Sequence, residues 1–321
     1  MSRPKLTHTV TSEEAGMRLD RLARKLYAGK PLSWVYRQIR TGGLKASGKK
    51  QGQNYRVSEG EVVELPAPKD EKKREAPLPR WEGDEPNFLA EAEGWLAIDK
   101  PVGLSVQGGK GTGRQNVVTW LRMKFHGEKY IPAPAHRIDR ETSGLILCSK
   151  KPSVARRMLQ DFKDGRVEKE YLALAQGIIE KPFAVDAPLE KITEGLLRSK
   201  VSDKGQPAKT EFVPLASGDE LTLLLAKPLT GRTHQIRAHL AYAGHPLAGD
   251  QRYGGEEMPE IGLRGGQFFL HAFRLNAPDP DREVERIRLE APLPEKFWKA
   301  LEKIGIEWEE IQEKIATEEE N

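Results

Sequence analysis

A proline- and charge-rich stretch, residues 66–86, divides the sequence and constrains the fold more than any other feature. It mixes prolines with runs of Lys, Arg, Asp and Glu and has no apolar periodicity, which is typical of an extended linker. The chain has 321 residues, and domains usually span roughly 100–200. The sequence therefore predicts a small domain over residues 1–66, a linker over 67–87, a larger domain over 88–298 and an acidic helical tail over 299–321.

Charge is distributed unevenly between these parts. Residues 1–75 hold seventeen Lys and Arg against nine Asp and Glu, a balance of +8, whereas the remainder carries −4 and the whole chain +4. A basic module of this kind indicates either a nucleic-acid-binding surface or a strongly solvated face. Charge alone leaves both interpretations open.

Composition excludes several classes of protein. The chain is 37% hydrophobic and 31% charged, with a mean hydropathy of −0.63, which is typical of a globular protein and not of a disordered one. No stretch approaches the roughly 20 apolar residues that span a bilayer, and the first residues lack the apolar core of a secretory signal. We therefore expect no membrane association and a cytoplasmic location. The single cysteine, Cys148, excludes an internal disulfide and, after an apolar run, predicts a buried structural thiol.

The basic amino-terminal part shows two helical patterns. Leu19, Leu22 and Leu26 recur at helical spacing, and the basic side chains between them fall on other faces. A second short helix is predicted after Pro31, capped by Ser33 and stopped at residues 42–43. Glycine-containing turns and β-branched runs then predict small strands up to residue 66.

This order of elements resembles the S4 RNA-binding module over about residues 15–66. The matching positions are Gly16, Arg18, Leu19, Asp20, Ser33, Arg37, Ile39 and Gly42. Ser47 departs from the pattern, which usually has Asn before the glycine at this point. The resemblance implies a small α/β RNA-binding domain, and the basic residues expected to contact RNA are Arg18, Arg21, Arg37, Arg40 and Lys45.

The larger domain alternates apolar runs with polar helical patterns. The runs over residues 94–100, 144–150, 170–179 and 220–226 predict strands. Together with the helical patterns between them, they predict an α+β domain in which a mixed sheet carries helices.

Chemically capable side chains are densest in residues 136–144, just before one predicted strand. Taken alone, this stretch favours a turn in which Asp139 and Thr142 cap backbone amides while the arginines face water. A carboxylate pair of Asp139 with Glu141 in a hydrolase is a second interpretation.

Four ordered blocks resemble the RluA-type pseudouridine synthases. They are residues 136–144, the earlier block 99–106, the block 168–173, and the block 228–240 with its continuation through 244–250 and 253–254. Ile138 replaces the usual Leu, and Gln107 stands where many members have His. The resemblance implies an α+β pseudouridine synthase domain with a mixed, mainly antiparallel sheet. It also implies RNA as substrate, most nearly the large-subunit (23S) ribosomal RNA of the RluC/RluD-like branch, with no cofactor and no metal.

Converting uridine to pseudouridine breaks the C1′–N1 bond, rotates the base and joins C1′ to C5, without redox change. A carboxylate suits this chemistry as a nucleophile or a base, and both routes stay open. The resemblance gives this role to Asp139, with Arg237 favoured over Arg232 as the cation that keeps it charged. It assigns Tyr171 to packing against the flipped uracil and Arg137 to the vacated space in the RNA. The remaining residues expected to bind substrate are His136, Thr142, Arg232 and Gln235.

Three further expectations concern the arginine-bearing block, metal binding and a glycine-rich run. Thr233 is predicted to cap a helix that carries Arg237 and ends at Gly244. The histidines at 234, 239 and 245 are too loosely spaced for a zinc pair, so no metal is expected. The glycine-rich run 108–114 lacks the spacing of a phosphate-binding loop and is predicted to touch RNA backbone.

The expected partner is ribosomal RNA, with transfer RNA as an alternative, and the expected state is a monomer. The rival hypothesis from another functional class is a noncatalytic RNA-binding protein of ribosome assembly that retains this fold.

Overall fold

The computed structural model describes residues 5–27, 30, 32–66, 81–108, 115–192, 198–282 and 284–320. The chain forms two compact units, Met1–Pro77 and Leu78–Asn321, and each is described by itself. Most of the predicted linker (67–80) and of the glycine-rich run (109–114) lies outside the described residues. No helix in the described part is long and apolar enough to cross a bilayer.

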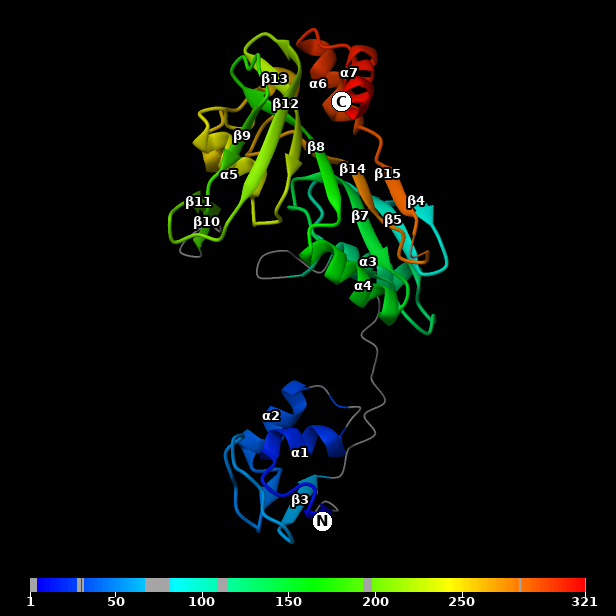
Figure 1. Cartoon of the computed structure of the whole chain (residues 1–321), viewed down its shortest axis with the longest axis vertical. Coiled ribbons are helices and arrows are strands. Elements are labelled where there is room, and N and C mark those ends of the chain that lie inside the picture. The colour runs from blue at the N-terminus through cyan, green and yellow to red at the C-terminus, as the bar shows by residue number, and fades with distance from the viewer. Residues whose placement is uncertain are drawn as a thin grey trace. The chain divides into compact units, whose positions relative to one another are not determined.

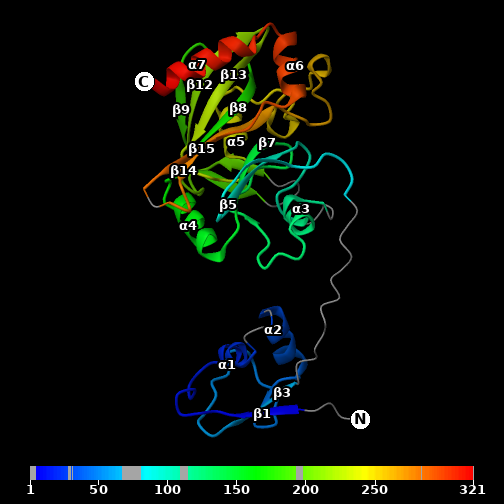
Figure 2. The ribbon, with the colours of Figure 1, turned by 90° about the vertical axis from the view of Figure 1, so that its right-hand side faces the viewer.

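The first unit packs two helices on one side of a small antiparallel sheet (Figure 2). Its elements are β1 (Lys5–Thr9), α1 (Leu19–Leu26), α2 (Leu32–Thr41), β2 (Lys45–Ala46) and β3 (Val62–Pro66), and the strand order is β1-β3-β2. Leu19 and Leu22 are fully buried with Val35 and Ile39, as the helical spacing predicted.

The bounds of α2 correct one prediction and confirm another. The helix begins at Leu32, so Ser33 lies inside its first turn and does not cap it. Gly42 follows the helix with φ +75°, because a residue without Cβ takes the left-handed conformation that ends helices at little cost.

A two-residue turn explains the departure at Ser47. Ser47 and Gly48 have φ values of 49° and 72°, and the Ala46–Lys49 bridge closes the turn around them. Two successive positive φ angles define the hairpin turn in which Asn-Gly is most favourable. Ser47 occupies this position with its hydroxyl donating to Glu61 at 2.9 Å.

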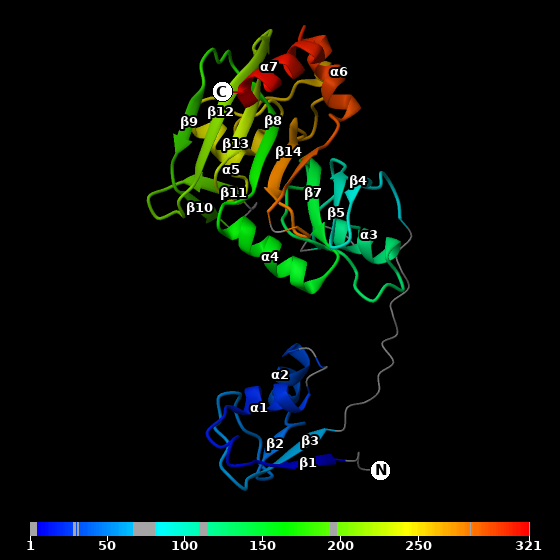
Figure 3. The same ribbon diagram turned by 45° about the vertical axis from the view of Figure 1, so that its right-hand side comes forward.

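The second unit is built on one ten-stranded sheet with the order β4-β5-β7-β14-β8-β13-β12-β9 (Figure 3). In addition β15 pairs with β14, β6 pairs with β7, and β10 and β11 form a separate hairpin. The strands are β4 (Asn87–Glu91), β5 (Trp95–Lys100), β6 (Ala133–Pro134), β7 (Ser143–Ser149), β8 (Glu168–Gln176), β9 (Phe183–Asp186), β10 (Leu189–Ile192), β11 (Arg198–Val201), β12 (Lys209–Gly218), β13 (Leu221–Pro228), β14 (Leu270–Pro278) and β15 (Arg286–Glu290).

Among the described residues only the β7–β14 pair is parallel, so the predicted mixed, mainly antiparallel sheet is confirmed. All four predicted strands are present, as β5, β7, β8 and β13. Cys148 is fully buried in β7, as its apolar surroundings predicted.

Helices cover both parts of this sheet (Figure 1). They are α3 (Val117–Lys124), α4 (Pro152–Lys163), α5 (Gln235–Tyr242), α6 (Glu295–Lys303) and α7 (Trp308–Glu320). Residues of α3 and α4 share one core with β5 and β7. On the other half of the sheet, α6 and α7 pack on one set of buried side chains and α5 on another.

Two predicted domain limits differ from the units of the structure. The division at residue 298 falls inside α6, and Ile311 and Ile315 of α7 are buried in the same core as β13, so the acidic tail is part of the second unit. At the other end, residues 81–87 pack on this unit as well. Glu85 accepts the indole N–H of Trp120 at 3.1 Å and pairs with Lys124 at 2.7 Å. The proline- and charge-rich composition of the predicted linker gave no sign of these contacts.

Candidate active site

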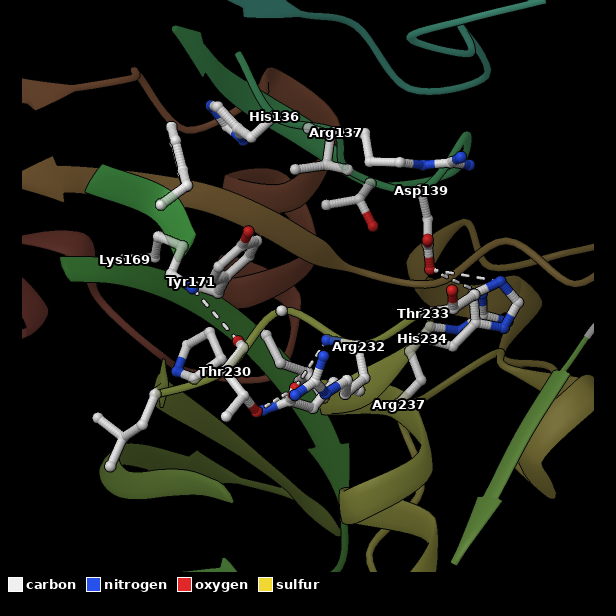
Figure 4. Close-up of a pocket in the computed structure, with 18 of the residues that line it drawn as sticks. His136, Arg137, Asp139, Lys169, Tyr171, Thr230, Arg232, Thr233, His234 and Arg237 are labelled. Carbon is white, nitrogen blue, oxygen red and sulfur yellow. Dashed lines mark hydrogen bonds and ion pairs between the residues drawn. The ribbon is translucent and has the colours of Figure 1, made fainter. Parts of the chain in front are cut away.

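A pocket of about 610 Å³ in the second unit gathers most of the predicted site residues (Figure 4). Its walls come from the turn before β7, the end of α4, the first half of β8 and the segment between β13 and α5. These segments are far apart in sequence and meet because β14 joins β7 to β8. The predicted site residues in the walls are His136, Arg137, Asp139, Thr142, Tyr171, Arg232, Gln235 and Arg237.

Asp139 lies in the turn before β7 and contacts Arg237. Its Oδ2 accepts a hydrogen bond from Arg237 Nη1 at 3.1 Å, and its side chain is 21% exposed. The amide of Thr142 donates to the backbone oxygen of Asp139 at 3.2 Å. Asp139 lines the pocket, and its carboxylate caps no amide among the described residues, contrary to the simple turn interpretation.

A buried lysine anchors the turn that carries Asp139. The Nζ of Lys100 donates to the backbone oxygens of Pro101, Leu104 and Arg140, at 2.9, 2.8 and 3.2 Å. Burial lowers the pKa of Lys100 to about 7, although nearby carboxylates, Glu141 and Asp139 among them, oppose that shift. Because Arg140 follows Asp139 directly, this anchor fixes the backbone that presents the carboxylate.

Arg237, in the first turn of α5, is held from three sides. Its Nε and Nη2 donate to both oxygens of Asp250 at 2.6 and 2.9 Å. Its guanidinium also lies over the rings of Tyr253 and Phe268, 4.9 and 4.4 Å from their centroids. Burial by itself lowers the pKa of Arg237, but the two carboxylates outweigh it and raise the pKa, so the cation persists.

The predicted preference for Arg237 over Arg232 agrees with this geometry. Arg232 is half-buried, and its Nε donates to the backbone oxygen of Pro207 at 2.9 Å. Arg232 lines the pocket but makes no ion pair with Asp139 in the described structure.

The start of α5 differs from the prediction. The residue before the helix is His234, in a left-handed conformation, and no side chain of the described residues caps the helix. Thr233 is therefore not the cap, and its backbone oxygen accepts the Ser199 hydroxyl at 2.6 Å.

Gln235 supports the wall instead of offering a free amide to substrate. Its Oε1 accepts the Thr230 hydroxyl at 2.6 Å and the Arg232 amide at 2.9 Å. Its Nε2 donates to Lys209 and Thr210 at 2.9 and 3.0 Å. With these bonds in place, its geometry favours shaping the turn before α5 over the expected contact with substrate.

His136 also packs into the wall. Its ring stacks on Phe162 with 4.7 Å between centroids and accepts the Leu147 amide on Nε2 at 3.0 Å. Burial lowers the pKa of His136 to about 3, so the ring is neutral near pH 7.

Three other residues remain available to a ligand. Tyr171 presents its ring to the middle of the pocket (Figure 4), and burial, with a smaller effect of the Asp139 charge, raises its pKa. Arg137 is exposed and has no hydrogen bond or ion pair within the described residues. The Thr142 hydroxyl is buried and likewise has no partner there.

Sequence reasoning missed Asp250, Tyr253, Lys100 and Lys169. Lys169 donates to the Thr230 backbone at 3.2 Å from inside the pocket wall, and burial lowers its pKa. All four lie in the blocks that carry the family resemblance. Nothing in their spacing says which side chains face the pocket, and only an alignment of related sequences carries that signal.

The expected RNA-contacting residues of the first unit differ in their surroundings. Arg21, Arg37 and Arg40 are exposed, and Lys45 is half-buried. Arg18 forms a two-point pair with Asp20 at 3.1 and 2.8 Å. Among the residues that the structure describes, no group of three or more His, Cys, Asp or Glu side chains is arranged to hold a metal ion.

Comparisons with known proteins agree on one family. Residues 94–242 match the family model described as RNA pseudouridylate synthase. The chain is 34% identical to ribosomal large subunit pseudouridine synthase C of Pasteurella multocida, over 91% of this chain and 92% of that protein. It is equally 34% identical to the protein of that name in Escherichia coli, over 92% and 95%.

Two solved human structures also resemble it. RNA pseudouridylate synthase domain containing 1 shares 27% identity with a TM-score of 0.54, covering 67% of this chain and 86% of that one. RNA pseudouridylate synthase domain containing 4, at 24% identity, shares the fold with a TM-score of 0.57 over 68% and 93%. With nearly full-length relatives above 30% identity, the chain belongs to the family of RNA pseudouridylate synthases.

Proposed function

We propose that this protein isomerises specific uridines of large-subunit (23S) ribosomal RNA to pseudouridine, with Asp139 as its catalytic carboxylate. The observation that carries the proposal is the Asp139–Arg237 contact at 3.1 Å in the wall of the pocket. The names of the full-length relatives, which are synthases of the ribosomal large subunit, support this choice of RNA.

The pair suits the reaction electrostatically. An anion in a partly closed pocket needs a nearby cation to remain charged, and Arg237 is fixed by Asp250 before any substrate arrives. A preorganised charge costs no reorganisation during the reaction. Asp139 thus acts on the sugar either by attack at C1′ or by removing a sugar proton, and both routes use the same carboxylate.

The rest of the pocket suits a flipped nucleotide. A stacked base cannot present its glycosidic bond, so the nucleotide has to leave the stack at a cost of a few kcal/mol. The ring of Tyr171 offers a flat surface for the uracil, and the unpartnered Thr142 hydroxyl offers a hydrogen bond. Arg137, exposed at the pocket, supplies a planar guanidinium that can occupy the vacated space in the RNA.

The first unit is proposed to bind RNA as an S4-like module. Arg21, Arg37 and Arg40 project from its two helices into solvent, where they can meet phosphates without sequence preference. A ribosomal substrate corresponds to action in the cytoplasm of a bacterial cell. The monomeric state and the independence from cofactor and metal remain predictions of the family resemblance.

The test is pseudouridine mapping by carbodiimide-dependent primer extension on ribosomal RNA from cells that lack the protein. The cells are complemented with wild type, with Asp139→Asn or with Glu141→Gln. We expect particular large-subunit pseudouridines to disappear and to return with wild type and Glu141→Gln but not with Asp139→Asn.

Other outcomes separate the alternatives. If the pseudouridines of ribosomal RNA were unchanged and one were missing from transfer RNA, transfer RNA would be the substrate. Unchanged pseudouridine in all RNA would favour the noncatalytic assembly protein. Release of free uracil from RNA by the purified protein, abolished in Glu141→Gln, would favour the hydrolase.

A further inference from the structure

His234 adopts a left-handed backbone conformation. Its φ and ψ are 53° and 28°, in the left-handed region that costs energy for any residue with a Cβ. Its side chain is only 8% exposed and points into the site (Figure 4). Strained residues of this kind persist where the surrounding structure enforces them, often at functional sites.

Hydrogen bonds define which ring nitrogen of His234 carries the proton. The Tyr253 hydroxyl receives the Ser199 amide at 2.8 Å and lies 3.0 Å from His234 Nδ1. A tyrosine hydroxyl has a single proton to donate, and among the described residues Nδ1 is the acceptor within its reach. Tyr253 therefore donates to Nδ1, and the neutral ring carries its proton on Nε2.

That Nε2–H faces the catalytic carboxylate. His234 Nε2 lies 3.7 Å from Asp139 Oδ2, the same oxygen that accepts from Arg237. Burial lowers the pKa of His234 to about 4, although the Asp139 charge partly opposes this, so the ring is neutral near pH 7. The separation exceeds a hydrogen bond, and such contacts often shorten only in the substrate complex.

We propose that His234 is a positioning residue whose Nε2–H closes onto Asp139 Oδ2 when uridine binds. With Arg237 and His234 both donating to Oδ2, Oδ1 is left as the oxygen that meets the sugar. Ser199 and Tyr253 act indirectly, because their hydrogen bonds fix the Nε2–H tautomer of His234. This inference rests on the proposed function and assigns the two oxygens of its carboxylate different tasks.

A matched pair of substitutions tests the role. The amide nitrogen of Gln can replace Nε2 of histidine, whereas the shorter Asn tolerates the left-handed backbone but cannot reach Asp139. We expect His234→Asn to lower kcat roughly 10- to 100-fold, the usual range for a hydrogen bond to a charged group. His234→Gln should recover most of that loss, with KM little changed in either. The assay is tritium release from RNA labelled at C5 of uridine.

The tautomer is tested separately by ¹⁵N spectra of histidine-labelled protein at pH 7.5, with the His234 signals identified by their absence in His234→Asn. We expect the Nε2–H pattern in wild type, a shift towards the other tautomer in Tyr253→Phe, and a changed Nε2 resonance in Asp139→Asn. An Nδ1–H pattern in wild type, or equal kcat losses in the Gln and Asn variants at unchanged Tm, would overturn the inference. If wild type itself releases no tritium from any RNA, the proposed function fails, while the spectra still decide the tautomer.

Discussion

At the residue scale, one guanidinium serves two carboxylates. Arg237 contacts Asp139, the proposed catalytic carboxylate, and the fully buried Asp250, which is 1% exposed. A buried carboxylate that loses its partner is left in a medium that solvates it poorly. The same arginine thus pairs with one carboxylate in the pocket and with another in the interior of the second unit.

We predict that Arg237→Met lowers the free energy of unfolding by about 3–5 kcal/mol. The double variant Arg237→Met/Asp250→Leu should recover a large part of this loss, because neither charge of the buried Arg237–Asp250 pair remains. Arg237→Met and the double variant should both be inactive. Urea denaturation of the two single variants and the double variant measures the coupling. Additive losses would show that Asp250 does not depend on Arg237.

The sequence indicated the residues that are proposed to act on substrate, but not the residues that fix their positions. Asp139 and Arg237 stand in motifs whose residue types suggest a carboxylate and its cation. The supports at Asp250 and Tyr253 depend on where the chain returns after α5, which no local pattern encodes. The sequence also could not show how Gln235 is held. Its hydrogen bonds to Thr230 and Thr210 exist only in the folded chain, so its residue type alone suggested a contact with substrate.

At the scale of elements, the entry into β7 determines where Asp139 is presented. Gly144 has φ +106°, and a Cβ there would lie 2.3 Å from the backbone oxygen of Ala272 in β14. Such a close approach lets the parallel β7–β14 pair form directly beside the turn that carries Asp139. The apolar runs predicted β7 and β8, but not β14 between them, because that pairing joins segments distant in sequence.

Replacing this glycine should separate the two strands. We predict that Gly144→Ala lowers the free energy of unfolding by about 2–5 kcal/mol, from the positive φ and the backbone clash together. Gly231→Ala is the matched control, since a Cβ there meets nothing within 4 Å, and we expect a change of less than about 1 kcal/mol. Equal losses in the two variants, measured by thermal and urea unfolding, would contradict this account.

His271 makes the same junction sensitive to acid. Its ring is fully buried, with Ser143 at 2.9 Å and the Ala291 backbone oxygen at 3.3 Å, and burial lowers its pKa from 6.5 to about 4. The folded state therefore binds fewer protons than the unfolded state between these pH values. Its contribution to stability is complete above pH 6.5 and is lost as the pH falls towards 4.

From pH 7.5 to pH 5 we predict that this one group reduces the free energy of unfolding by about 2 kcal/mol. His271→Gln should be less stable at neutral pH but should lose less on acidification. The measurement is urea denaturation of both proteins at several pH values. Parallel curves would show that His271 does not carry the effect.

At the scale of the whole molecule, RNA affinity and catalysis are assigned to different units. The first unit presents exposed basic side chains on two helices, and the second holds the pocket. The uneven charge predicted a basic first unit, and its binding to RNA stays a prediction. The extent of the second unit could not be predicted, because the acidic end of the chain is mostly polar and gives no sign of the buried face of α7.

We predict that Arg37→Gln/Arg40→Gln weakens RNA binding and reduces the slope of log Kd against log salt by about 2, because each arginine removed leaves one phosphate with its counterions. At saturating RNA, kcat should be unchanged, since neither residue lines the pocket. Fluorescence anisotropy at several KCl concentrations measures the slope. Lys296→Gln/Lys299→Gln on α6 removes the same charge from the second unit and should leave the slope as in wild type.

The position of β14 also affects how the protein is made. On the ribosome, β7 and β8 emerge well before the strand that lies between them, so the growing chain carries two unpaired edges until residue 278 has been synthesised. Open edges of this kind recruit other chains and favour aggregation. Premature termination before Leu270 would consequently leave a sheet without its central strand, and an incomplete product could not join Asp139 to Arg237 and modify RNA.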